Sequence, residues 1–282
     1  MRSAPVMLAC TTVLALAACG GGGDPSLGEH DPAAPDRGVV IWAVGDGGAD
    51  DDDDRQVAGL IARDDPAHVI YLGDVYDTGT PEEFRTFADV YGPLVRRMWP
   101  TPGNHEWAKH ASGYDPFWRE TLGRPLPPHY ERRAGGWQLL SANSETPDDP
   151  RQLRWLRDRA SGGGTCRLAF WHSPRFNAGK HRNEEIDVDG LWDAVAGRAA
   201  IVLSGHDHNL QRFHPVDGTT QYVAGAGGRG HHDVREEDPR LAFSEDTTDG
   251  ALRIVLTGGT ADLEFIAADG TVLDRSTVAC RD

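Results

Sequence analysis

Short apolar runs alternate with helical segments along most of this chain, and the alternation constrains the fold more than any other feature of the sequence. The runs are rich in Val, Ile, Leu and Trp, and Gly or Asp bounds most of them, which is typical of buried strands. They are VVIWAVG (39–45), HVIYLG (68–73), WQLLSA (137–142), CRLAFW (166–171), AAIVLSG (199–205) and QYVAGA (221–226). With helices between them, such runs predict an α/β fold with a partly parallel sheet.

Helix signals lie between these runs. Residues 55–65 (RQVAGLIARDD) have apolar side chains at helical spacing. Residues 80–83 (TPEE) form a capping box with proline at the first helical position and predict a helix to about Arg97, and residues 149–152 (DPRQ) repeat that signature. Residues 251–278 lack a helix signal and predict antiparallel strands joined by Gly-rich and Asp-Gly turns.

The N-terminus carries a targeting signal. Residues 1–18 have a basic start and an apolar stretch too short to span a membrane, and they end directly before Cys19. This resembles a bacterial lipoprotein signal peptide in which Cys19 is lipidated; the alternative is an ordinary secretory signal cut after Ala18. Residues 19–38 are expected to be a flexible Gly/Pro-rich tether and residues 39–282 one domain. We therefore expect an exported protein, lipid-anchored to a bacterial membrane and facing the periplasm or cell exterior.

The cysteine count predicts a disulfide, and the net charge limits the classes of ligand that the protein can bind. Outside the signal and the lipidation site, Cys166 and Cys280 remain as an even pair, and we predict a disulfide between them. The formal net charge is −16, so binding to a nucleic-acid backbone is not expected. A phosphate-bearing substrate would need a site where the electrostatic potential is positive despite the negative net charge, and a metal cluster can supply it.

Polar side chains follow five of the predicted strand ends, where α/β sheets bind their ligands. In the extended segment GHDH (205–208), residues two apart point the same way, so His206 and His208 face one site and Asp207 points away from it. Imidazoles with carboxylates opposite are ordinary ligands for Zn, Fe or Mn, whereas the two histidines alone could be a solvated turn. The residues after the strand ends are Asp46, Asp74, Asn104, His105, His172, His206 and His208.

The motifs around these residues occur in the order DGG (46–48), GDVY (73–76), GNHE (103–106), WH (171–172) and GHDH (205–208). On these motifs the chain resembles the calcineurin-like metallophosphoesterase superfamily, and within it the purple acid phosphatase-like branch. The resemblance implies a four-layer α/β/β/α sandwich with two mixed β-sheets and a binuclear metal centre.

The resemblance also implies how the metals are held. Asp46, Tyr76 and His208 would bind the first ion, Asn104, His172 and His206 would bind the second, and Asp74 would bridge them. Gly48 stands where most of the wider family has histidine, which points to the tyrosine-ligated branch, with Fe³⁺ beside Fe²⁺, Zn²⁺ or Mn²⁺. The branch has two residues between the aspartate and the tyrosine, but here only Val75 separates them, so Tyr76 could instead pack beside the strand end.

By the same resemblance, phosphate monoesters would be hydrolysed by metal-activated hydroxide. His105 would donate a proton to the leaving group or bind the phosphoryl oxygen; the alternative is that it orders Asp46 or Asp74. His181 stands where the branch has a substrate-facing histidine, although a solvated loop histidine is the alternative, and Arg182 replaces the second histidine of that pair. Rival functions are a phosphodiesterase or nucleotidase with the same centre, and a non-catalytic metal- or ligand-binding surface lipoprotein.

Several other signals are assigned no site. Residues 225–230 match G-x-G-x-x-G, but no apolar helical stripe follows, so the match predicts a loop. The acidic run 50–54 is interpreted as a solvated loop and His231-His232 as an exposed turn. Arg175 and Arg182 are expected to be surface charges.

Overall fold

The computed structural model describes Met1 and residues 38–181, 187–235 and 237–280. Apart from Met1 and Gly38, the predicted signal peptide and the tether with Cys19 lie outside the described residues, and so does Arg182. Among those that are described, no helix is both long enough and apolar enough to cross a membrane.

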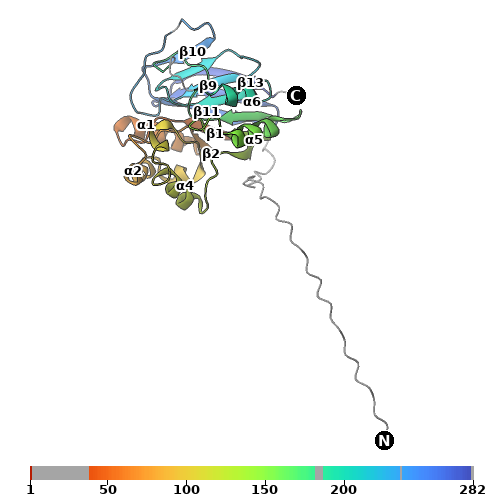
Figure 1. Cartoon of the computed structure of the whole chain (residues 1–282). Helices are drawn as coiled ribbons and strands as arrows, with labels where there is room; N and C mark the ends of the chain where they lie inside the picture. Colours follow the sequence, from red (N-terminus) through yellow and green to blue (C-terminus); the bar gives the residue numbers. More distant parts are fainter. Residues whose placement is uncertain (2–37, 182–186, 236, 281–282) are drawn as a thin grey trace.

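Two β-sheets form the centre of the molecule (Figure 1). One has six strands in the order β13-β12-β11-β1-β2-β3, and the other has seven in the order β10-β8-β9-β7-β6-β5-β4. The strands of the first sheet are β1 (Val39–Val44), β2 (His68–Tyr71), β3 (Met98–Pro100), β11 (Gly250–Leu256), β12 (Thr260–Ala267) and β13 (Val272–Ala279). Those of the second are β4 (Tyr130–Ala134), β5 (Trp137–Ser141), β6 (Arg167–Phe170), β7 (Ile201–Ser204), β8 (Leu210–Phe213), β9 (Thr220–Ala224) and β10 (Leu241–Glu245).

Both sheets are mixed. In the first, β1, β2 and β3 are parallel, and β11, β12 and β13 continue the sheet in antiparallel pairs. In the second, β5, β6, β7 and β9 are parallel, and β4, β8 and β10 pair antiparallel. The helices are α1 (Asp52–Asp64), α2 (Pro81–Tyr91), η1 (Gly92–Arg97), α3 (Asn104–Trp107), α4 (Tyr114–Leu122), α5 (Pro150–Ala160) and α6 (Asp189–Val195).

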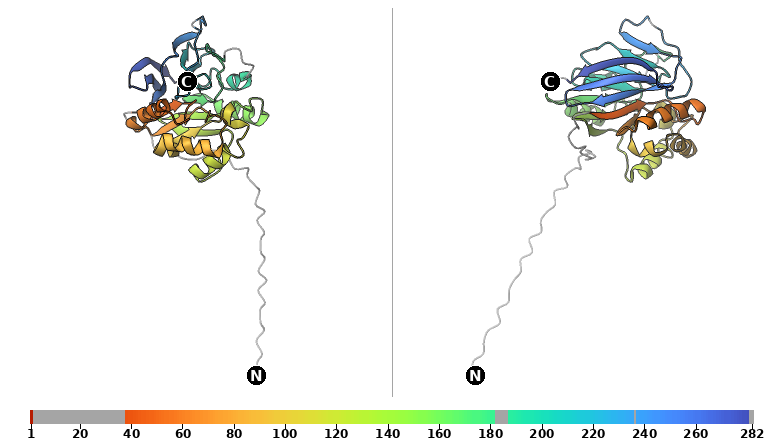
Figure 2. Two further views of the ribbon diagram at one scale, coloured as in Figure 1. Left: turned by 90° about the vertical axis from the view of Figure 1, so that its left-hand side faces the viewer. Right: turned by 180° about the vertical axis from the view of Figure 1, so that it is seen from behind.

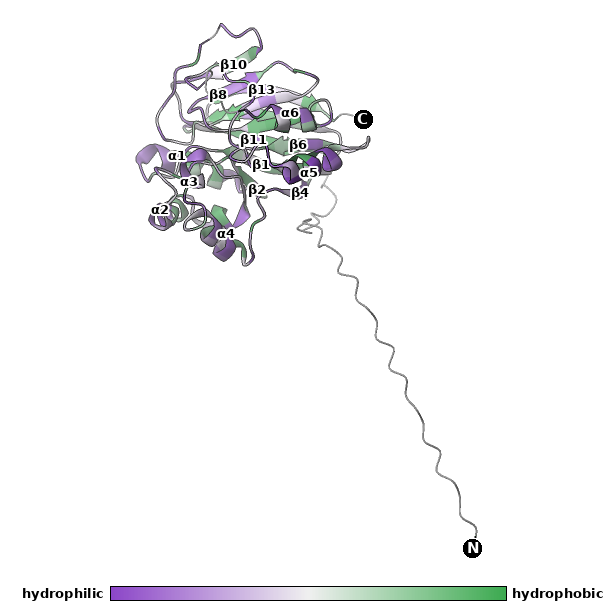
Figure 3. Cartoon of the chain, in the orientation of Figure 1, coloured by the Kyte–Doolittle hydropathy of each residue, from purple (hydrophilic) through white to green (hydrophobic). Residues whose placement is uncertain are grey.

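The alternation of side chains along each strand divides the core into layers. In β1, Ile41 belongs to the core between the two sheets, while Trp42 packs with α1 and α2 on the outer face. In β6, Phe170 faces the other sheet and Ala169 packs beneath α5 and α6. Figures 1 and 2 show α1, α2 and α4 gathered on one side of the sheets, and Figure 3 shows the apolar strands enclosed within. The predicted four-layer α/β/β/α sandwich is confirmed.

The helix boundaries differ from the sequence predictions in two places. The helix that opens at Pro81 ends at Tyr91 and continues as the 3₁₀ helix η1, because Pro93 has no N–H to donate. The acidic run is not a solvated loop: α1 begins at Asp52, and Asp51 caps it in a capping box with Asp54. Asp54 is fully buried, and its Oδ1 accepts a hydrogen bond from the Gly48 backbone N–H at 2.6 Å.

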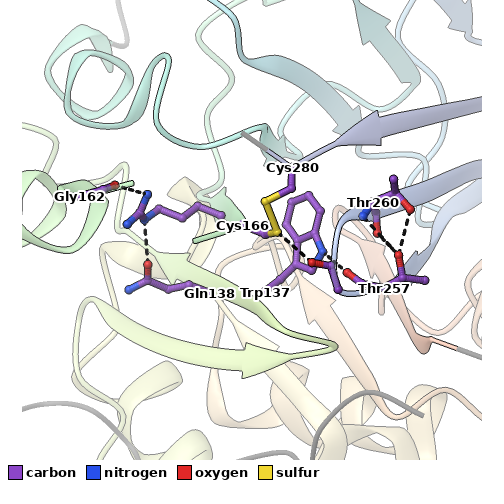
Figure 4. The surroundings of a disulfide bond; sticks show 9 residues. Trp137, Gln138, Gly162, Cys166, Thr257, Thr260 and Cys280 are labelled. Carbon is purple, nitrogen blue, oxygen red and sulfur yellow. Dashed lines mark hydrogen bonds between the residues drawn. A yellow bond between two sulfur atoms is a disulfide. The ribbon is translucent and has the colours of Figure 1, made fainter. Parts of the chain in front are cut away.

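The predicted pair Cys166 and Cys280 forms a disulfide, with the two Cα atoms 4.9 Å apart (Figure 4). Cys166 directly precedes β6 and Cys280 directly follows β13, so the bond joins the two sheets covalently. Close to it, the indole N–H of Trp137 donates to the Thr257 carbonyl at 2.7 Å, a second contact between the sheets.

Candidate metal centre

Five strand ends from the two sheets deliver the predicted site residues to one edge of the sandwich. Asp46 follows β1, Asp74 follows β2 and Asn104 follows β3 in the first sheet; His172 follows β6 and His206 follows β7 in the second. Carboxyl ends of parallel strands meet at one edge, so the side chains converge although they come from distant parts of the chain. Asp74, His172 and His206 alone place three potential ligand atoms within 4.8 Å of one another.

One group of side chains gathers around the hydroxyl of Tyr76. This oxygen lies 2.6 Å from Nε2 of His208, 3.2 Å from Oδ2 of Asp74 and 3.4 Å from Oδ1 of Asp46. The loop shortened at Val75 therefore still carries the phenol into the site, and Tyr76 does not merely pack beside the strand end.

A second group gathers around Oδ1 of Asn104. This oxygen lies 3.0 Å from Nε2 of His172 and 3.0 Å from Nδ1 of His206, and the two ring nitrogens are 3.2 Å apart. Oδ2 of Asp74 lies 3.3 Å from Nε2 of His172. The same carboxylate oxygen is thus within reach of both groups.

The hydrogen bonding of His172 shows that these residues fit a cation. Its Nδ1 lies 2.7 Å from the Leu72 carbonyl oxygen, which can only accept, so Nδ1 carries the ring proton. The lone pair of Nε2 then faces oxygens of Asp74 and Asn104, which are acceptors as well. Converging lone pairs in a buried site need a proton or a metal ion between them, and this donor set suits Zn, Fe or Mn.

The local backbone is bent sharply at the same residues. Asp46, Asp74 and His206 have φ angles of 61°, 63° and 72°, in the left-handed region that side chains other than glycine rarely adopt. Strain of this kind is concentrated at functional sites. Gly103 is required as well, since a Cβ there would lie 2.1 Å from Oδ1 of Asp74.

Gly48 cannot be replaced by a histidine ligand in this structure. Its φ is +87°, and a Cβ would lie 2.6 Å from the ring of Phe87, a buried residue of α2. The first group therefore relies on Asp46, Asp74, Tyr76 and His208.

Burial sets the protonation of these residues. Burial raises the pKa of Asp46 well above its usual range. It lowers the pKa of His208 to about 3, so the His208 imidazole is neutral and can donate a lone pair to a metal ion. Burial alone would raise the pKa of Asp74, but His172 and His105 together hold it below its usual range. Burial, with the charges of Asp46 and Asp74, raises the pKa of Tyr76, so a phenolate there requires a nearby cation.

His105 stands at the edge of a cavity of about 550 Å³ that opens over both groups. Its Nδ1 lies 2.6 Å from the Asp77 carbonyl oxygen and therefore carries a proton, which leaves Nε2 as the reactive ring atom. Nε2 is 3.9 Å from Oδ2 of Asp74, and the side chain is 37% exposed. The ring is placed to exchange a proton with a molecule in the cavity.

His181 and Asp207 also lie at this site. The His181 ring is 4.5 Å from that of His206 and lines the cavity. Asp207 points away from the two groups, as expected, and is fully buried; its Oδ1 lies 3.3 Å from Nδ1 of His181 and 3.1 Å from Nδ1 of His232.

The expectation for His232 was wrong. Its side chain is only 12% exposed, and its ring is stacked on that of His208 with centroids 3.9 Å apart. Its backbone N–H donates to the His208 carbonyl at 3.0 Å, which draws the loop against the site. No local pattern marks this contact, because it joins residues 24 apart. His231 lines the cavity too, and pairs with Asp249 at 3.1 Å.

Sequence reasoning also gave no role to Glu106. Its buried carboxylate accepts the backbone N–H groups of Asp74 at 3.2 Å, Val75 at 3.2 Å and Gly103 at 2.9 Å. It therefore fastens the loop after β2 to the start of α3. The signal available in the sequence was the glutamate at the third position of a helix that begins at Asn104.

Two further predictions are confirmed, for residues 225–230 and for Arg175. Residues 225–230 form a loop in which glycine is needed, since a Cβ on Gly227 would lie 2.2 Å from the Gly45 carbonyl oxygen. Arg175 is a surface charge paired with Asp189 at 2.6 Å.

Comparison with known proteins shows the family of the chain. Residues 39–210 match the family model of the calcineurin-like phosphoesterases. The tartrate-resistant acid phosphatase type 5 of Rattus norvegicus is 24% identical, over 75% of this chain and 76% of that protein.

Solved structures share the fold. GAP50 of Plasmodium, described as the anchor in the inner membrane complex, has a TM-score of 0.72 at 12% identity, covering 86% of this chain and 89% of that chain. A purple acid phosphatase from yellow lupin (Lupinus luteus) seeds also has a TM-score of 0.72, at 15% identity, covering 86% of this chain and 53% of that chain. This chain thus spans about half of the length of the lupin enzyme.

Proposed function

Because this chain belongs to the calcineurin-like phosphoesterase family, and is therefore a hydrolase that acts on phosphate esters, we propose that it hydrolyses phosphate monoesters at a binuclear metal centre. The observation that carries the proposal is the position of Asp74. Its Oδ2 lies 3.2 Å from the Tyr76 hydroxyl in one group and 3.3 Å from Nε2 of His172 in the other. The acid phosphatase activity named for the rat relative supports monoesters as substrates.

Each group would hold one ion. Asp46, Tyr76 and His208 would hold the first ion, Asn104, His172 and His206 would hold the second, and Asp74 would contribute to both sites. We assign ferric iron to the first site, since a phenolate is a hard anionic donor, and a divalent ion (Fe²⁺, Zn²⁺ or Mn²⁺) to the second.

Charge explains how an acidic protein attracts a phosphate dianion. Asp46, Asp74 and a Tyr76 phenolate contribute three negative charges, and a trivalent and a divalent ion contribute five positive charges, which leaves about +2 at the site. This local field opposes the net charge of −16 carried by the whole chain.

The protein's own groups complete the reaction. When bound, the two ions stabilise charge on the phosphoryl group and lower the pKa of the attacking water. His105 has its Nδ1 fixed on the Asp77 carbonyl, so its Nε2 would give a proton to the leaving alkoxide. Burial of Asp46 and Asp74 excludes bulk water from the ligand side of the site.

A substrate comparison tests this function. The purified protein, stripped with a chelator and reloaded with iron and zinc, should hydrolyse p-nitrophenyl phosphate much faster than bis-(p-nitrophenyl) phosphate. A preference for the diester would replace monoester hydrolysis by phosphodiester hydrolysis. Metal loading without turnover of either compound would point to a metal-binding protein without catalysis.

We also propose that the protein is exported and lipid-anchored through Cys19, with residues 1–18 removed. The Cys166–Cys280 disulfide supports an oxidising compartment. Cys19→Ala should release the protein from the membrane fraction or block its processing, and a wild-type protein that is soluble without detergent would contradict the lipid anchor.

A further inference from the structure

A row of basic side chains extends from the metal groups toward the protein surface. The cavity over the two groups is also lined by Lys180, Arg229 and His232. A neighbouring cavity of about 350 Å³ shares Lys180, His231 and His232 with it and adds Asp233 and Arg235. The two cavities therefore adjoin at Lys180, His231 and His232, and the cavity over the metal groups alone, at about 550 Å³, has the size of sites for small organic ligands rather than for a lone phosphate ion.

Lys180 is held in this row by a chain of three polar groups. Its Nζ lies 3.3 Å from Nε2 of His232, and Nδ1 of the same ring lies 3.1 Å from Oδ1 of the buried Asp207. A lysine ammonium has only donors, so Nε2 accepts and Nδ1 carries the proton that Asp207 accepts. The His208 backbone N–H is also 3.3 Å from Nδ1, but the carboxylate is closer and is the partner consistent with the lysine.

The loop that carries His232 is fixed relative to the metal groups. The His232 ring is stacked on His208, a residue of the first group, with an interplanar angle of 11°. Asn209 donates its side-chain N–H to the His232 carbonyl at 3.0 Å, which complements the backbone bond from His232 to His208. The His232 ring thus links Lys180 to His208, a proposed ligand of the first ion.

A third metal ion is the alternative for this cluster, because His181, Asp207 and His232 place ligand atoms within 4.8 Å of one another. The lysine argues against it. The proton on Nδ1 of His232 occupies the lone pair that an ion would need, and a cation beside the Lys180 ammonium would be repelled. Among the described residues that line the outer cavity, Lys180 and Arg235 attract an anion at this place, and Asp233 is the one carboxylate that opposes it.

We propose that Lys180, positioned by the Asp207–His232 pair, binds a second anionic group of the substrate, so that the enzyme prefers phosphate monoesters that carry a further phosphate or carboxylate. This rests on the proposed monoesterase function. For an alkyl bisphosphate, water adds to one phosphorus, the P–O bond to the alkyl oxygen breaks, and that oxygen takes a proton from His105. The products are inorganic phosphate and the hydroxyalkyl monophosphate.

The test compares propane-1,3-diol bisphosphate with 3-hydroxypropyl phosphate, which differ only in the second phosphate. We expect the wild type to have a higher kcat/KM for the bisphosphate. Lys180→Gln should lower that preference by about tenfold or more through KM, as for a lost charge-assisted hydrogen bond, and leave kcat/KM for 3-hydroxypropyl phosphate within about threefold. His232→Gln should act in the same direction. Lys109→Gln is the matched control, since Lys109 lines neither cavity.

Each other result has a definite meaning. No preference for the bisphosphate in the wild type, or the same preference in Lys180→Gln and Lys109→Gln, would overturn the second subsite and leave the proposed function standing. Three metal ions per chain, falling to two in His232→Gln, would replace it by a third metal site. No hydrolysis of these compounds or of p-nitrophenyl phosphate would overturn the proposed function and this inference with it.

Discussion

The side chain of His105 shows how a single hydrogen bond can fix a chemical role. The Asp77 carbonyl holds the proton on Nδ1, so a second proton can be gained or lost only at Nε2, on the cavity side. The sequence predicted His105 as a proton donor but could not show this carbonyl, because Asp77 lies 28 residues earlier in the chain.

His105→Gln should keep both metal ions but lower kcat by ~10²-fold or more on an alkyl phosphate, the usual scale of a general acid. The effect should shrink with p-nitrophenyl phosphate, whose leaving group needs little protonation. His110→Gln is a suitable control, since His110 stacks on Trp107 outside the cavity lining. Equal turnover of the two variants on the alkyl phosphate would make His105 a structural residue.

Tyr76 is the residue on which the metal identity depends. Iron-loaded wild-type protein should absorb visible light through charge transfer from the phenolate, and Tyr76→Phe should lose that band and retain iron less well. Asn104, His172 and His206 should still hold the second ion. Tyr91→Phe makes the same change at the buried last residue of α2 and should keep the colour. A colourless iron-loaded wild type would remove Tyr76 from the ligands.

Among residues, those at strand ends were the predictable ones. The end of each apolar run predicts the end of a strand, and the polar residue that follows it can be read directly from the sequence. His232 was not predictable, because its contacts with His208 and Asp207 join separate loops. For Glu106 the sequence offered only its place in the first turn of a helix, and its contact with Asp74, 32 residues earlier, has no local signal.

At the scale of elements, the loop after β2 and the helix α3 act as one unit. Glu106 joins them through three backbone N–H groups while lying fully in the interior. Glu106→Gln exchanges one accepting oxygen for an N–H₂ group, so at least one buried N–H loses its acceptor, at a cost of about 1–3 kcal/mol.

That variant should therefore melt several degrees lower than wild type and bind its metals more weakly, because Asp74 and Asn104 lie on the two segments that Glu106 joins. Glu82→Gln makes the same chemical change at an exposed position in the first turn of α2. Thermal unfolding and chelator competition on both variants measure the difference. Identical melting and metal retention would show that the carboxylate is dispensable.

Elements were predictable where burial imposes a pattern. The six apolar runs became β1, β2, β5, β6, β7 and β9, within one or two residues at their ends. β4 was not predicted, because its sequence, YERRA, is polar. Pairing with β5 stabilises this strand, and the Arg132 side chain lies over the Tyr130 ring. β3 has only three residues, too few for a pattern.

At the scale of the whole molecule, the two-sheet sandwich followed from the family resemblance and not from periodicity. Alternating strands and helices predict parallel pairing, but they do not say which strands share a sheet. The division depends on long-range contacts, such as the antiparallel pairing of β1 with β11 more than 200 residues later.

The disulfide stabilises the whole fold because it closes a loop with a sequence separation of 114. In the chain-entropy model, such a bridge stabilises the fold by up to ~4–5 kcal/mol. Cys166→Ser with Cys280→Ser should lower the free energy of unfolding in denaturant by an amount of this order, without changing metal content. Two reactive thiols in the unfolded, unreduced wild type would show that the bridge is not formed.

The central claim is that one carboxylate, Asp74, serves two metal ions. Metal analysis of the reloaded wild type and of Asp74→Asn, measured per folded chain, tests it most directly. We expect two ions in the wild type and loss of both in the variant, because each group shares Oδ2 of Asp74. A folded Asp74→Asn protein that still binds two ions would contradict the account.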